Sequence, residues 1–202
     1  EGNYKMYPFA YMVGCDLNAS SWAVQLLPYI DQAPLAMKWN PEVPAFNEAV
    51  ALFPPNAVQE NLEVIDTTLE AFLCPSMPGV AKQDYGLPAN AGGPGVPPID
   101  LTWTAARSDY CISTGVRGAY ANIAYQGNPG GDREGAIQPT LCNAGSSSKM
   151  RDVRDGVTYT ILVGERAGGS SIYRRGEIDT NLTVMFGPAN GGAWGELLNG
   201  EH

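Results

Sequence analysis

The sequence predicts an α+β fold, in which N-terminal helices pack on an antiparallel sheet made mainly from the second half of the chain. Apolar residues recur at helical spacing in the first third, whereas the second half holds short runs of β-branched and aromatic residues. The connections between those runs are short and lack a helical pattern, which favours antiparallel pairing. A chain of 202 residues is most simply a single domain, spanning residues 1–202.

Three helices are expected from capping residues and apolar periodicity, of which the shortest runs from Asn47 to about Leu52. Ser20 or Ser21 suits the cap of a helix that reaches about Ile30. Pro28 should kink or shorten this helix, because proline has no N–H to donate to the preceding turn. The third helix should follow a pair of prolines and cover Ala57–Ile65.

The least ambiguous strand is Val157–Val163, which reads VTYTILV and follows the turn-forming pair Asp155-Gly156. We expect it in the middle of the sheet. Further strands are expected at Leu69–Leu73, Leu101–Thr104, Tyr110–Ser113, Gly135–Gln138, Ser171–Tyr173 and Leu182–Phe186. Residues 75–98 hold six Pro and five Gly, so they predict a long Gly/Pro-rich surface loop without regular structure.

Composition excludes several classes of function. The net charge is −9 and the chain holds only 12 Lys and Arg, which argues against nucleic acid and anionic membrane surfaces as partners. The single histidine is His202, so histidine-activated nucleophiles and most His-ligated metal sites are excluded. Phosphate-binding glycine motifs are also missing. We therefore predict no catalytic, cofactor-binding or metal-binding residues.

An even number of cysteines at long spacings is typical of an exported protein with two disulfides. The four candidates are Cys15, Cys74, Cys111 and Cys142. Cys74–Cys111 is the pairing we favour, because both lie at the ends of expected strands around one long loop, and this leaves Cys15–Cys142. Free, buried cysteines in a cytosolic protein are the alternative.

Carboxylates are the remaining candidates for chemistry. Glu165, Glu177 and Asp179 lie near expected strand ends, where a glycoside hydrolase could place its acid and base. Solvation or pairing with neighbouring arginines is the interpretation we favour. Asp152 and Asp155 could hold calcium, but turn and capping roles suit them better.

Tryptophans offer the main alternative function. Trp39, Trp103 and Trp194 could form the aromatic face of a secreted carbohydrate-binding module, with a glycan as ligand. Core packing is the interpretation we favour for these three, and we assign Trp22 to the core as well.

Four stretches also resemble, in order, blocks of a known family. They are Ser21–Gln32 (SWAVQLLPYIDQ), Phe72–Ser76 (FLCPS), Asp109–Gly115 (DYCISTG) and Asp152–Glu165 (DVRDGVTYTILVGE). The chain is thereby identified as a member of the DUF1559 family of planctomycete type IV pilin-like or pseudopilin-like surface proteins. The resemblance covers roughly residues 7 to 194.

The resemblance implies a pilin-like globular head that acts as a structural subunit, without catalysis, together with other pilin-like subunits in a filament or pseudopilus. It implies an extracellular or cell-surface location. Family members open with a hydrophobic helix that anchors the protein in the membrane, and we expect this chain to be the part that follows the helix, from Glu1. The family's final strand has no counterpart before His202, so the sheet is expected to lack it.

Overall fold

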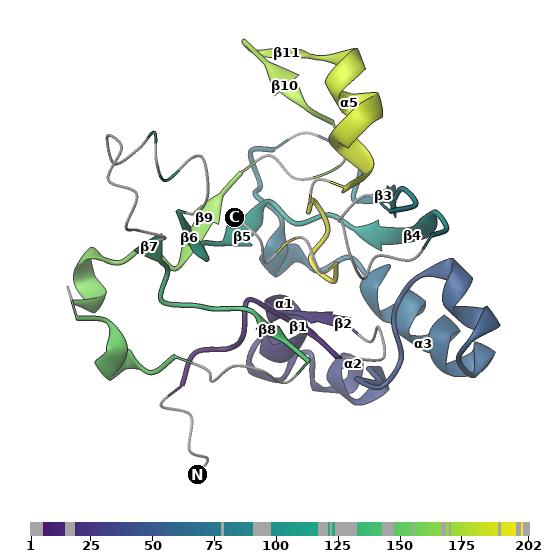
Figure 1. The fold of residues 1–202 in the computed structure, drawn as a ribbon, viewed down its shortest axis with the longest axis horizontal. Helices are drawn as coiled ribbons and strands as arrows, with labels where there is room; N and C mark the ends of the chain where they lie inside the picture. Colours follow the sequence, from purple (N-terminus) through teal and green to yellow (C-terminus); the bar gives the residue numbers. More distant parts are fainter. Residues whose placement is uncertain are drawn as a thin grey trace.

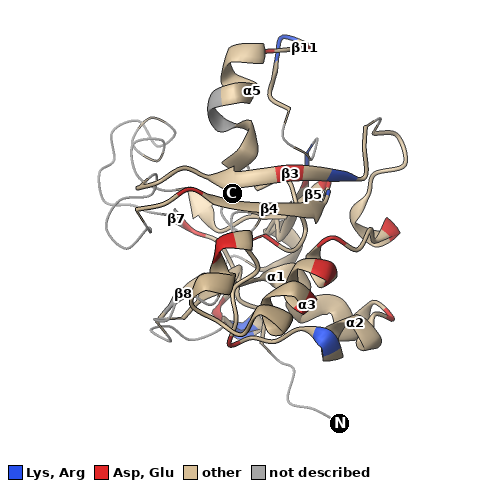
Figure 2. Cartoon of the chain, turned by 90° about the vertical axis from the view of Figure 1, so that its right-hand side faces the viewer, with Lys and Arg blue, Asp and Glu red and all other residues tan. Residues whose placement is uncertain are grey.

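The β3–β4 hairpin divides the molecule between two groups of helices. In this computed structural model the N-terminal helices lie together on one side of the hairpin, while α5 and the β10–β11 hairpin project from the other (Figures 1 and 2). The structure describes residues 6–199 except 15–18, 78, 91–97, 117–120, 122, 124–132, 143–147, 155, 167, 168, 170, 190, 197 and 198.

Most of the elements are short. The α-helices are α1 (Trp22–Leu26), α2 (Ala33–Lys38), α3 (Pro55–Ile65) and α5 (Thr180–Phe186). The 3-10 helices are η1 (Leu27–Tyr29), η2 (Asn47–Ala51), η3 (Glu70–Phe72), η4 (Met150–Asp152), η5 (Val157–Tyr159) and η6 (Gly187–Ala189). The helices of the described part are all too short to cross a membrane.

The strands are short too, with six residues each in β3 and β4 and two or three in the others. They are β1 (Tyr11–Val13), β2 (Ala19–Ser21), β3 (Lys82–Leu87), β4 (Leu101–Ala106), β5 (Tyr110–Ile112), β6 (Gly115–Val116), β7 (Arg133–Glu134), β8 (Thr140–Leu141), β9 (Val163–Glu165), β10 (Tyr173–Arg174) and β11 (Glu177–Ile178). In the described part they form five small sheets, of which four are antiparallel pairs: β3–β4, β5–β9, β6–β7 and β10–β11. In the fifth, β1 pairs antiparallel with β2 and parallel with β8.

The α+β class with N-terminal helices is confirmed, but the single antiparallel sheet is wrong. The first predicted helix divides into α1 and η1, and Pro28 is the second residue of η1. This division follows from the missing N–H of proline. The predicted helix Ala57–Ile65 is α3, and the strands expected near Leu101 and Tyr110 are β4 and β5.

The predicted central strand is wrong in both conformation and position. Val157–Tyr159 forms the single turn η5, which follows Gly156 at a φ of 93°. The strand β9 begins only at Val163, and among the described strands it pairs with β5 alone. Although Val157–Val163 has the composition of a strand, its first three residues form a turn after Gly156, and the segment lies at the surface.

Three further local predictions are corrected. Leu182–Phe186 is helical in α5, because the Asp179 carboxylate accepts the N–H of Leu182 at 3.0 Å and caps the helix. The expected strand Leu69–Leu73 contains η3 instead. The loop expected over residues 75–98 contains β3, in which Gly86 permits close pairing, since a Cβ there would lie 2.9 Å from the Leu101 carbonyl oxygen.

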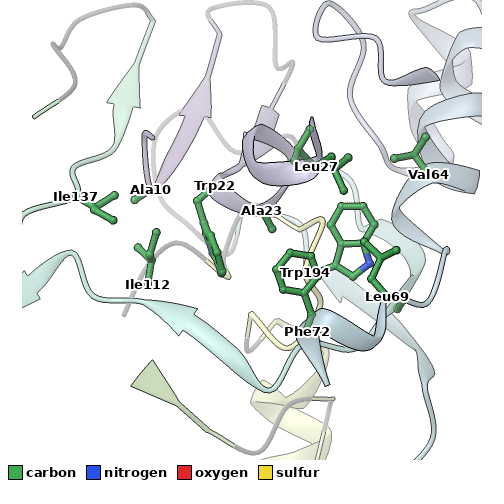
Figure 3. Close-up of a cluster of buried hydrophobic side chains, with 12 residues drawn as sticks. Ala10, Trp22, Ala23, Leu27, Val64, Leu69, Phe72, Ile112, Ile137 and Trp194 are labelled. Atoms are coloured by element: carbon green, nitrogen blue, oxygen red, sulfur yellow. The ribbon is translucent and has the colours of Figure 1, made fainter. Parts of the chain in front are cut away.

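Aromatic side chains form the centre of the main core. Trp22 packs edge-on against Phe72, with ring centroids 5.7 Å apart, and Phe72 stacks on Trp194 at 5.8 Å. Figure 3 shows these rings surrounded by aliphatic side chains from α1, α3 and β5. The core therefore joins the N-terminal helices to the C-terminal segment that carries Trp194.

Candidate functional site

The stretches used for the family resemblance meet in the interior around Asp109. The main-chain N–H of Asp109 donates to the carbonyl of Phe72 at 2.8 Å, and its carboxylate accepts the N–H of Cys74 at 2.8 Å. The carbonyl of Asp109 accepts the N–H of Arg166, directly after the fourth stretch, at 2.8 Å. One aspartate thus connects the second and third stretches to the residue that directly follows the fourth.

A buried ion pair holds this aspartate in place. The guanidinium of Arg107 lies 3.3 Å from the Asp109 carboxylate, and both side chains are almost completely buried. Arg107 also donates to the carbonyl of Met77 at 3.3 Å. Removing one partner of such a pair leaves an uncompensated buried charge, so the pair specifies this arrangement of segments.

The first stretch is joined to the same region through the C-terminal segment. The hydroxyl of Ser21 donates to the carbonyl of Trp194 at 2.7 Å, and the indole N–H of Trp22 donates to the side chain of Asn199 at 2.7 Å. The indole N–H of Trp194 donates to the carbonyl of Thr67 at 2.9 Å. The polar groups of Ser21, Trp22 and Trp194 therefore form buried structural hydrogen bonds.

A second buried polar group, formed by Glu196 of the C-terminal segment, lies against the β3–β4 hairpin. The Glu196 side chain is only 4% exposed, and its Oε2 accepts the indole N–H of Trp103 at 3.2 Å. Among the described residues, the Glu196 Oε1 and the Tyr85 hydroxyl are both buried without a hydrogen-bond partner. Glu196 is therefore a buried carboxyl group with only one of its two oxygens hydrogen-bonded.

Burial controls the ionisation of this pair. It raises the pKa of Glu196 to about 8, although the N–H groups of Ala193 and Trp103 and the positive charge of Arg166 act in the opposite direction. Burial, followed by the nearby Glu196 carboxyl, also raises the pKa of Tyr85. Both groups are consequently neutral at pH 7. Sequence reasoning missed them, although a glutamate within the apolar, glycine-rich run GGAWGELL was a usable signal.

The predicted disulfide between Cys74 and Cys111 is wrong, because both cysteines are free. The Cys74 Sγ lies 3.0 Å from the Ser76 hydroxyl, whereas the buried Cys111 thiol faces the Gly164 carbonyl of β9. In the other predicted pair, Cys142 is disulfide-bonded, as that pairing requires, and Cys15 lies outside the described residues.

The carboxylates considered for a hydrolase lie on separate elements. Glu165 is in β9 and Glu177 is in β11, and both are exposed. The cavity that Glu177 and Asp179 line includes two arginines but does not include Glu165. Asp179 caps α5 and lies 3.9 Å from the Arg174 guanidinium.

The proposed calcium ligands behave as turn residues where they are described. The Asp152 carboxylate accepts the N–H of Lys149 at 2.8 Å, which closes the first turn of η4, while Asp155 lies outside the described residues. No group of three or more potential metal-binding His, Cys, Asp or Glu side chains occurs within the described part of the chain.

The tryptophans do not share an exposed face. Trp194 is completely buried, as Trp22 is nearly so, which confirms the core assignment of both. The indole of Trp103 is tied to Glu196, and Trp39 packs partly buried against two core clusters. An aromatic binding platform that includes Trp194 is therefore wrong.

One polar surface cavity, of about 310 Å³, lies between residues 134–138 and 148–160. Its wall is fixed by the turn at Gly135, where a Cβ would lie 2.5 Å from the Ser113 carbonyl oxygen. Glu134 lines it from one side, and Arg154 and Thr160 of the fourth stretch line it from the other.

The structure is an α+β domain. The stretches that resemble the family hold separate segments of it together, through the hydrogen bonds of Asp109 and Ser21. A family model described as "Protein of unknown function (DUF1559)", also called SBP_bac_10, matches residues 1–195. The chain therefore belongs to the DUF1559 family. Comparisons with curated proteins and with solved structures gave no match.

Proposed function

We propose that this chain is the globular head of a pilin-like structural subunit, which is displayed outside the cell and acts without catalysis. The observation that carries the proposal is that the stretches resembling the family make structural contacts. Their polar side chains, above all Asp109 and Ser21, bond to buried main-chain groups and hold distant segments together. A protein selected to hold a shape under load at a surface needs such contacts more than it needs a reactive cleft.

Charge supports an exposed, solvated role. The chain has a net charge of −9, and acidic positions lie on α3 and β3 in Figure 2. Such a surface favours solubility and disfavours binding to nucleic acid or anionic lipid. In this proposal the membrane is reached only through a hydrophobic helix that precedes Glu1 in the full-length protein, and the partners are other pilin-like subunits.

The reading frame upstream of Glu1 gives the first test. We expect it to encode a short basic leader followed by a hydrophobic helix that joins this domain directly. A cleavable signal peptide, or a separate soluble domain at that place, would contradict the pilin-like function.

Surface display gives the second test. Intact cells that carry the full-length protein with an epitope tag in the domain should lose the tag on brief trypsin treatment, while a cytoplasmic marker stays intact. Protection of the tag until the cells are lysed would contradict the proposal. Neither test depends on how the subunits touch.

A carbohydrate-binding module gains no support from the structure, since Trp194 lies in the core. A glycan array with the purified domain checks this directly. Binding that Trp103→Ala abolishes would favour the module over the structural subunit.

A further inference from the structure

The β10–β11 hairpin and α5 form an arm, residues 171–186, that projects from the body of the molecule (Figures 1 and 2). Hydrogen bonds brace this arm from within. The hydroxyl of Thr183 in α5 accepts the N–H of Ile172, which lies directly before β10, at 2.9 Å. The N–H of Asp179, directly after β11, donates to the carbonyl of Ile172 at 2.9 Å. The hairpin is therefore held in a defined position on α5, with its turn at the tip of the arm.

An arginine occupies a strained position in that turn. The register of the hairpin leaves Arg175 and Gly176 as a two-residue loop, and both have a positive φ, of 55° and 88°. Loops of this kind favour asparagine, aspartate or glycine at the first position, because other side chains are disfavoured in the left-handed region. Arg175 is exposed and forms no ion pair with another described residue. Strain of this kind points to a use for the side chain outside its own chain.

The charges beside the turn leave Arg175 as the cation available at the tip. Arg174 lies opposite Glu177 in the hairpin register, and its guanidinium lies 3.9 Å from the carboxylate of Asp179. Both acidic side chains of the hairpin and its end are therefore placed beside Arg174. The charge of Arg175 has no such neighbour in the register.

Exposed apolar side chains accompany this charge. Tyr173 and Ile178 lie opposite each other across the two strands, and they are 50% and 54% exposed. Opposite residues of a hairpin share one face, so the two side chains form a single small apolar patch. Tyrosine and arginine are the residues that most often dominate the energy of a protein interface. The tip therefore has the composition of a docking surface.

A complementary surface lies on α3. Glu60 and Glu63 are both exposed, lie on one side of the helix, and form no ion pair with another described residue. Residues 39–81 contain no Lys or Arg. The neighbouring η2 packs against α3, and there Val50 and Leu52 are 49% and 76% exposed. This surface thus offers unpaired negative charge near exposed apolar side chains.

We propose that the tip of the arm docks on the α3 surface of a second copy of the chain, with Arg175 beside Glu60 and Glu63. Within one copy the arm and α3 lie on opposite sides of the β3–β4 hairpin, so the contact forms between copies (Figure 2). The two surfaces differ, which makes the contact heterologous and lets it continue from one copy to the next. The inference rests on the proposed function in so far as subunits must meet, and it names one contact through which they do.

Sedimentation velocity of the purified chain at about 0.15 M salt tests the proposal, because the long-range repulsion between two chains of net charge −9 is then largely screened. The unchanged chain should associate as its concentration is raised over about a hundredfold range. Arg175→Asn should weaken association by about tenfold. Asparagine suits the left-handed turn, so the same variant should keep or raise the melting temperature. The matched control is Arg151→Asn on η4, whose side chain is 79% exposed, and it should leave association unchanged.

A mixing experiment tests that two different surfaces meet. Arg175→Asn keeps the α3 surface intact, and the double variant Glu60→Gln/Glu63→Gln keeps the arm intact. Each should associate about tenfold more weakly than the unchanged chain, whereas their equimolar mixture should form pairs, because one intact arm then meets one intact α3 surface.

Three results would each overturn the proposal: a chain that stays monomeric throughout, association that Arg175→Asn or the glutamate variant leaves intact, or a mixture no stronger than its two components. A monomeric chain that is correctly displayed on cells overturns this contact alone, whereas association of a protein confined to the cytoplasm overturns the proposed function alone.

Discussion

Glu196→Gln should change how the stability of the domain depends on pH. Burial raises the pKa of Glu196 to about 8, against an ordinary value of 4.5. Between these two values the folded chain keeps a proton that the unfolded chain has released. The contribution of Glu196 to stability is therefore complete below about pH 4.5 and is lost as the pH rises toward 8.

The magnitude follows from the shift. Each unit of pKa corresponds to about 1.4 kcal/mol, so the interval from 4.5 to about 8 corresponds to a loss on the order of 5 kcal/mol. Glutamine keeps the shape and can still accept the Trp103 N–H, but it has no charge to bury. The variant should therefore gain stability relative to the unchanged chain as the pH rises across this interval.

Urea unfolding followed by tryptophan fluorescence, at several values between about pH 5 and about pH 8, measures this difference. Glu63→Gln on the exposed side of α3 is the matched control, and its difference from the unchanged chain should stay nearly constant. Parallel stability curves for the unchanged chain and Glu196→Gln would refute the reasoning about the buried carboxyl.

Three further predictions concern packing and access. Gly135→Ala should lower stability by about 1 to 3 kcal/mol in thermal unfolding, because the new Cβ meets main chain across the turn. Ser21→Ala should cost about 1 to 3 kcal/mol in urea unfolding, since it leaves the buried carbonyl of Trp194 without its donor, and Ser21→Thr should recover part of this loss. In the folded domain Cys74 should react with iodoacetamide before Cys111, whose thiol is buried and has a raised pKa, and peptide mass spectrometry would show a contrary order.

Proline positions and apolar periodicity predicted the helices well, because these local features determine helix boundaries directly. Pro28 interrupts the first helix where its missing N–H requires, and the periodicity of Ala57–Ile65 gives α3. Composition failed where one side-chain contact, or a contact with a distant segment, determines the secondary structure. Asp179 turns the strand-like LTVMF into α5, and Gly86 serves close strand pairing in β3 where it had indicated a loop.

The site was harder to predict because it is assembled from five separate parts of the chain. Sequence order places Ser21, Cys74, Asp109, Arg166 and Trp194 far apart, and only the fold brings their polar groups together. The resemblance identified the family correctly, but it did not say that most of these stretches are internal. For Val157–Val163 the reverse holds, since the composition predicted burial and the structure places the segment at the surface.

Equilibrium unfolding of Asp109→Asn tests most directly whether the family stretches meet in a junction that holds the fold. Asparagine keeps the size of the side chain but leaves the buried Arg107 without its counter-charge. We predict a loss of about 3 kcal/mol or more, or failure to fold, with Glu63→Gln on the exposed side of α3 as the control. A variant within about 0.5 kcal/mol of the unchanged chain, the range of ordinary surface substitutions, would contradict the account.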